Sequence, residues 1–168
     1  MKTGVKPGWG LLLCGFSVGC TGQGIVASTL GLMLKREFGE TVDLWGISLG
    51  VATLTGLLLA GRWIADLMAP VLGAITDRLG RPISALIFFE MGAFALTGGV
   101  WLGGPVALVM GVLLFYINAT GVAISLSSEA GSRGSKSLAS YVTASDCGSA
   151  AGPILGCLVL FWEGLCTL

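Results

Sequence analysis

The sequence predicts an all-α integral membrane protein with about five transmembrane helices. Of its 168 residues, 54% are hydrophobic and only 11% are charged, whereas soluble domains carry about 25% charged residues. The charged residues gather in short segments between long apolar runs, and about 20 apolar residues suffice for a helix to cross a bilayer. The 28 glycines suit closely packed membrane helices, because small residues let two backbones approach each other.

Composition and charge exclude several other classes. The formal net charge is zero, so nucleic-acid binding has no electrostatic support. Histidine is absent, which removes the commonest metal ligand and the usual proton carrier near neutral pH. Without histidine the chain holds no Ser/His/Asp, Cys/His or metal-ligand set. We therefore expect no enzyme, no cofactor and no metal site, and membrane lipid as the surrounding medium.

The five cysteines are odd in number and lack C-x-x-C spacing. We interpret them as small residues that pack between helices, rather than as disulfides or metal ligands. They are Cys14, Cys20, Cys147, Cys157 and Cys166.

The first predicted helix covers about residues 9–34 and follows a charged start. A secretory signal also begins this way, but its apolar core is shorter than this run. A polar link, residues 35–43, leads to a second apolar run at about 44–75. That run is longer than a bilayer crossing needs, so we expect it to tilt or protrude and to bend near Pro70.

The rest of the chain reads as three more helices within a single membrane domain, residues 1–168. A tight uncharged reversal, Gly103-Gly104-Pro105, separates the third helix from the fourth, and a polar, flexible link at 127–137 precedes the fifth. The three helices are expected at about 83–102, 106–126 and 138–162.

The distribution of basic residues predicts the orientation. On the side of the N-terminus we expect Lys2, Lys6, Arg78, Arg81, Arg133 and Lys136. The opposite side has only Lys35 and Arg36, beside acidic residues. Because cytoplasmic loops are enriched in Lys and Arg, we expect a cytoplasmic N-terminus in the plasma (inner) membrane. An interfacial aromatic belt at the helix ends agrees with this topology: Trp9, Trp45, Trp101 and Trp162.

Four charged residues fall inside the predicted spans: Arg62, Asp66, Glu90 and Asp146. Such residues cost at least about 2.5–3.5 kcal/mol each on insertion scales. Arg62 and Asp66 are spaced i,i+4, so they share a helix face and can pair. At about 1.5 Å per residue, the three acids lie roughly 13–17 Å deep, close to the midplane.

Two interpretations of these charges remain open. They form either a polar centre for a substrate or a coupling proton, or a buried structural network that joins the second, third and fifth helices. Four neutral polar residues share the ambiguity, since they either line a cavity or bond between helices: Gln23, Tyr116, Asn118 and Thr120.

Two glycine-bearing motifs point to a family. The turn from Gly73 to Pro82 reads G-x-(L/I)-x-D-R-x-G-R and resembles the loop signature of the major facilitator superfamily of secondary transporters. In the fifth helix, G-x-x-x-G-P-x-x-G-C resembles the signature of facilitator antiporters, with cysteine in place of the last glycine. Its glycines form one smooth stripe, and its proline favours a bend. The motif residues are Gly148, Gly152, Pro153, Gly156 and Cys157.

The resemblance implies the N-terminal half of a transporter that moves a small solute by alternating access. By resemblance, Asp77 caps a neighbouring helix and latches the outward-open state, while Gly73 and Gly80 allow tight turning. Arg78 and Arg81 bind across the cytoplasmic face; both also serve as a positive-inside anchor.

The chain departs from the family in two respects. The arginine common in the fourth helix of antiporters, in R-x-x-(Q/G)-G, is missing from Ile117–Gly121. Proton antiport is therefore not expected unless another group, such as Glu90, serves. The family has two six-helix repeats around a central site, so five helices imply a homodimer, a partner chain or a truncated product. The alternative function is a non-transporting subunit or assembly factor of a membrane complex.

Overall fold

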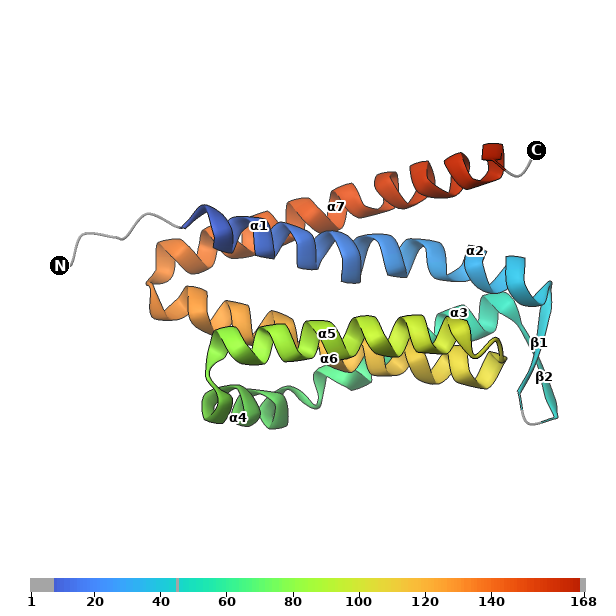
Figure 1. Ribbon diagram of the computed structural model, residues 1–168, viewed down its shortest axis with the longest axis horizontal. Helices are drawn as coiled ribbons and strands as arrows, with labels where there is room; N and C mark the ends of the chain where they lie inside the picture. Colours follow the sequence, from blue (N-terminus) through green and yellow to red (C-terminus); the bar gives the residue numbers. More distant parts are fainter. Residues whose placement is uncertain (1–7, 45, 167–168) are drawn as a thin grey trace. The chain divides into compact units, whose positions relative to one another are not determined.

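The computed structural model describes residues 8–44 and 46–166 of the chain (Figure 1). A short antiparallel hairpin, β1 (Thr41–Leu44) and β2 (Ile47–Gly50), pairs Thr41 with Gly50. Everything else of regular structure is helical: α1 (Trp9–Val18), the π-helix η1 (Gly19–Val26), α2 (Ala27–Phe38), α3 (Val51–Asp66), α4 (Ala69–Leu79), α5 (Arg81–Trp101), α6 (Pro105–Ser132) and α7 (Ser135–Cys166).

Four of the described helices are long and apolar enough to cross a membrane: Trp9–Phe38, Arg81–Trp101, Pro105–Ser132 and Ser135–Val159. The helices α3 and α4 form a fifth span if they are taken as one helix with a bend of 54°. The fold is therefore compatible with an all-α membrane protein, as the composition predicts.

The exposed surface also fits a lipid environment. Large apolar side chains lie on the outside of the long helices, among them Trp63 at 74% and Phe94 at 81% of their full exposure. Soluble monomers rarely expose apolar patches larger than a few hundred Å². Trp9 begins α1, Trp101 ends α5, and Trp162 lies near the end of α7. Lys2, Lys6 and Trp45 lie outside the described residues.

The expected bend near Pro70 is confirmed. Helix α3 ends at Asp66, and α4 begins at Ala69 with Pro70 in its first turn. Proline is tolerated there because the first helical N–H groups have no intrahelical partner.

Three predicted boundaries are wrong. Leu44 and Ile47–Gly50 belong to the strands of the hairpin instead of a helix, and Gly46 has a φ of +82°. The polar link at 127–137 is helical up to Ser132 and again from Ser135, and it reverses at Gly134, whose φ is +114°. Such φ values are readily adopted only by glycine. The predicted turn Gly73–Pro82 is likewise helical up to Leu79.

The described chain forms two compact units. The terminal unit contains residues 8–29 and 126–166, and the central unit contains residues 30–125. In the terminal unit, α1 and η1 lie beside α7 (Figure 1). Leu11, Ala130 and Tyr141 form a small buried cluster there, with Leu126 and Leu138 packed against it.

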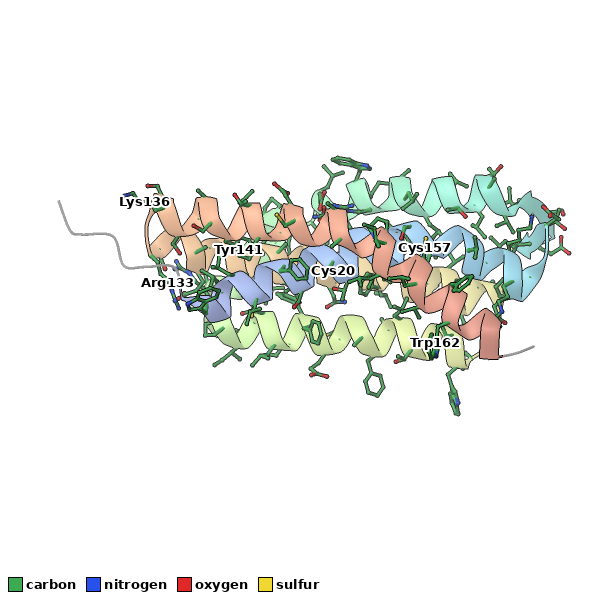
Figure 2. The ribbon with its side chains drawn as sticks, turned by 90° about the horizontal axis from the view of Figure 1, so that it is seen from above. Cys20, Arg133, Lys136, Tyr141, Cys157 and Trp162 are labelled. Carbon is green, nitrogen blue, oxygen red and sulfur yellow. The ribbon has the colours of Figure 1, made fainter. Side chains whose placement is uncertain are left out.

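A seam of close backbone contacts, made at glycines of the N-terminal helix and of α7, holds the terminal unit together. A Cβ atom added at Gly24 of η1 would lie 2.5 Å from the Cα of Gly152 in α7. One added at Gly148 would overlap the carbonyl of Phe16. Figure 2 labels Cys20 of η1 and Tyr141 of α7 along this seam, where Tyr141 packs on Gly15. Only glycine permits this approach, and its close dispersion contacts replace the hydrophobic driving force that lipid removes.

In the central unit, α6 packs against α5 in antiparallel order. The Phe88 ring covers Gly121, and Gly92 faces Asn118. Further along, Gly99 of α5 meets Gly111 of α6. Glycine again allows close helix contact.

The seam predicts opposite effects for the same substitution at two glycines of the N-terminal helix. Gly24→Ala is expected to lower the free energy of unfolding by about 1–3 kcal/mol, because the new methyl group meets the α7 backbone. Gly10→Ala is expected to raise it by up to about 1 kcal/mol, because no atom lies within 4 Å of the added Cβ and alanine favours the helix. Denaturant unfolding in detergent micelles measures both. Equal stability of the two variants would contradict the seam.

Candidate functional site

A polar contact joins α3 to α6 in the central unit. The Thr120 hydroxyl donates a hydrogen bond of 2.9 Å to a carboxylate oxygen of Asp66. Toward the start of both helices, a Cβ added at Gly61 would lie 2.8 Å from Leu113. The two contacts follow the same order along both helices, so α3 and α6 run parallel here.

Arg62 and Tyr116 belong to the same stretch, between those two contacts. Tyr116 is 2% exposed, and its hydroxyl has no hydrogen-bond partner among the described residues. Arg62 is half-buried, and its charge is close enough to interact electrostatically with the Tyr116 phenol. We call Arg62, Asp66, Tyr116 and Thr120 the polar level.

The spacing of Arg62 and Asp66 permits an ion pair that the described conformation does not contain. No ion pair joins the two side chains, although both are described. The Asp66 carboxylate instead bonds to Thr120 on the neighbouring helix. An i,i+4 ion pair stabilises a helix by only about 0.2–0.5 kcal/mol, so an interhelical bond readily replaces it.

Glu90 of α5 lies at the depth of the polar level. Its neighbours along the helix, Phe88 and Gly92, contact Gly121 and Asn118 of α6, which bracket Thr120. Asp66 and Glu90 are therefore at similar depth, near the middle of α6, as their positions in the sequence predict.

Glu90 and Asp146 are the other two acids of the predicted spans. Glu90 and Asp146 are exposed, and neither makes a hydrogen bond or ion pair there. Asp146 belongs to the terminal unit.

The loop signature is placed differently from the predicted turn. Gly73 lies inside α4, so it does not make the reversal. Gly80 alone does, with a φ of +89°. Asp77 and Arg78 are exposed, and Arg81, which is half-buried, begins α5.

Asp77 caps no helix in the described part of the chain, since α5 has no side-chain cap. The signature helix is held instead by the pair Thr76 and Ser125, both buried, whose hydroxyls are 2.9 Å apart. Ser125 donates its own hydrogen to the Gly121 carbonyl, so Thr76 donates to Ser125.

The fifth-helix motif lies on the seam of the terminal unit. Gly148, Gly152 and Gly156 are all buried and face the first helix; a Cβ at Gly156 would lie 2.8 Å from Thr29. Pro153 lies inside α7, which runs from Ser135 to Cys166 as one helix.

Two of the four neutral polar residues make contacts between helices. Gln23 lies 3.3 Å from the Ser149 hydroxyl across the seam, and Thr120 also bonds between helices. The Asn118 amide donates within its own helix to Leu114. Tyr116 alone of the four has a buried hydroxyl left unpartnered by the described residues.

Sequence reasoning missed two features of this region. The Thr76–Ser125 bond carries no local signal, since 49 positions separate its partners. The unpartnered hydroxyl of Tyr116 depends on the helix rotation, which a sequence pattern of all-round apolar helices leaves open.

No protein-family model, curated protein or solved structure matches this chain. The resemblance to the major facilitator superfamily therefore rests on the two motifs.

A double-mutant cycle tests the contact between α3 and α6. Asp66→Ala and Thr120→Val are expected to show a coupling energy of about 0.6–1.7 kcal/mol, the range measured for interhelical hydrogen bonds in membranes. Thermal unfolding in detergent gives the four stabilities. Thr97→Val is the matched control, because that hydroxyl donates within α5. Additive effects for Asp66 and Thr120 would exclude the bond.

Proposed function

We propose that this chain is one half of a secondary transporter of the major facilitator type. It moves a small solute across the plasma (inner) membrane by alternating access, together with a second set of helices from another copy or a partner chain. The observation that carries the proposal is the polar level in the middle of the span. Within the described residues, Arg62 has no ion-pair partner there and the Tyr116 hydroxyl has no hydrogen-bond partner.

Energetics favour a functional role for the polar level. Ionisable residues within membrane spans are rare because they are costly, and they commonly mark substrate or ion pathways. A purely structural group would be expected to satisfy its hydrogen bonds inside the bundle. Asp66 and Thr120 do so with each other, whereas the Tyr116 hydroxyl has no described partner.

The exposed acids support the need for further helices. Glu90 lies at the depth of the polar level and faces outward, with the exposed side chains of Phe89 and Met91 beside it. Facing lipid there would cost at least about 2.5–3.5 kcal/mol on insertion scales. A second helix set that covers Glu90 removes this cost.

The loop signature supports the same mechanism by resemblance. The exposed Asp77 carboxylate has no described hydrogen-bond or ion-pair partner, so it is available to basic groups of the second helix set. Such a contact would latch one of the two access states. Arg78 and Arg133 then lie on the cytoplasmic side with the N-terminus.

A second candidate function is a non-transporting subunit or assembly factor. The exposed Glu90 favours it equally, because a mid-membrane carboxyl group is also a docking contact for a helix with a basic or hydrogen-bonding side chain. In that case the polar level has only a structural role.

Flux measurements distinguish the two functions. The purified chain, with any chain that co-purifies, is reconstituted in liposomes and tested for exchange of a panel of labelled small acids, sugars, amines and amino acids. We expect exchange of at least one class. Asp66→Asn and Asp77→Asn should each slow it at least about tenfold, as the loss of a charge-assisted interaction predicts.

Glu40→Gln is the matched control, since Glu40 pairs with Lys35 near the hairpin, outside the apolar spans. The docking function would be established instead by three results together. No class of solute is exchanged, and the chain is captured at fixed stoichiometry in a larger complex. Asp66→Asn and Glu90→Gln leave the assembly of that complex unchanged.

A further inference from the structure

We propose that Arg62 and Tyr116 bind the carboxylate group of a small organic solute that carries a single carboxylate. The inference deepens the proposed transport function and rests on it for the identity of the site. Its physical claim, that the site recognises a carboxylate, is separately testable.

The buried hydroxyl of Tyr116 is the first support. Other buried hydroxyls of the central unit are satisfied: Thr76 and Ser125 bond to each other, and Ser84 donates to the Gly80 carbonyl. The Tyr116 hydroxyl, in a side chain 98% buried, has no described partner. An unsatisfied buried donor costs about 1–3 kcal/mol, and a ligand oxygen at this position removes that cost.

Arg62 supplies the charge. Its planar guanidinium offers a fork of N–H donors that matches the two oxygens of a carboxylate. Among the described residues no carboxylate pairs with the Arg62 guanidinium, because the Asp66 carboxylate accepts a hydrogen bond from Thr120 instead. Arg62 is half-buried while Tyr116 is buried, so the arginine is the more accessible of the two groups.

The Arg62 guanidinium and the Tyr116 hydroxyl together favour an anionic ligand. Both groups donate hydrogen bonds, and one carries a permanent positive charge, so an acceptor with a negative charge satisfies them together. A neutral amide of the same shape lacks the charge and would leave the guanidinium unpaired in a medium where pairing matters most.

Asp66 limits the solute to a single carboxylate. It lies one turn from Arg62 on the same face of α3, about 6 Å along the helix axis. A second negative charge on a small solute would approach this carboxylate and be repelled. Dicarboxylates and inorganic phosphate are therefore disfavoured, whereas the ammonium group of an amino acid would be tolerated next to Asp66.

The test measures ligand-induced stabilisation of the purified chain in detergent. The probes are acetate, lactate and benzoate, each compared with its neutral amide at equal ionic strength. Alanine is compared with alaninamide, which keeps the ammonium group and lacks the carboxylate. We expect at least one carboxylate to raise the unfolding temperature, with no comparable rise from its amide, succinate or phosphate.

Two variants locate the effect. Tyr116→Phe removes only the hydroxyl and keeps the ring, so folding should be preserved. It should weaken the apparent affinity for the carboxylate at least about tenfold, the effect of losing a hydrogen bond to a charged group. Arg62→Gln should abolish the carboxylate response. Tyr141→Phe and Arg133→Gln, the matched controls in the terminal unit, should respond as the unchanged protein does.

Three results would overturn the inference: no stabilisation by any carboxylate probe, an equal rise with the amides, or an undiminished response in both Arg62→Gln and Tyr116→Phe. The flux assay separates this failure from failure of the transport function. Carboxylate binding without any flux would support the proposed carboxylate site and contradict the proposed transport function. Exchange of a neutral solute without carboxylate binding would support the transport function and contradict the carboxylate site.

Discussion

The hydrogen bond from Thr120 to Asp66 is the interaction on which the organisation of the central unit depends. In hydrocarbon there is no water to satisfy a carboxylate, so a hydrogen bond from a neighbouring helix lowers the free-energy cost of an acid there. By bonding across to α6, Asp66 joins α3 to that helix, and Arg62 has no ion-pair partner among the described residues. The availability of the Arg62 guanidinium is therefore a consequence of where one carboxylate finds its partner.

The glycines perform the complementary task of bringing helices together without a hydrophobic driving force. In the terminal unit, Gly24 and Gly152 allow direct contact between backbones. In the central unit, Gly121 accommodates the ring of Phe88 instead. Both arrangements replace side-chain volume with close dispersion contacts. The apolar side chains that a soluble protein would bury are consequently free to face lipid.

The sequence predicts the features that depend on composition and on the local effects of proline and glycine. The third helix, expected at about 83–102, is found at Arg81–Trp101, and the bend before Pro70 follows from proline chemistry. The hairpin is missed because the apolar residues Ile47 and Leu49 suit a strand as well as a helix. The π-helix η1 is missed because its departure from an ordinary helix has no counterpart in the apolar pattern.

Site residues are harder to predict than helices, for a physical reason. Spacing places Arg62 and Asp66 on one face, but it cannot say that a third residue, Thr120, competes for the carboxylate.

The most direct test of the account is the depth of α5 in a bilayer. Spin labels at single cysteines replacing Ile83, Met91 and Trp101 report relative access to oxygen and to a water-soluble nickel complex. We predict the deepest position at Met91, beside Glu90, and interfacial values at the two ends. A label at Met91 as accessible to nickel as the one at Trp101 would contradict a membrane-embedded polar level.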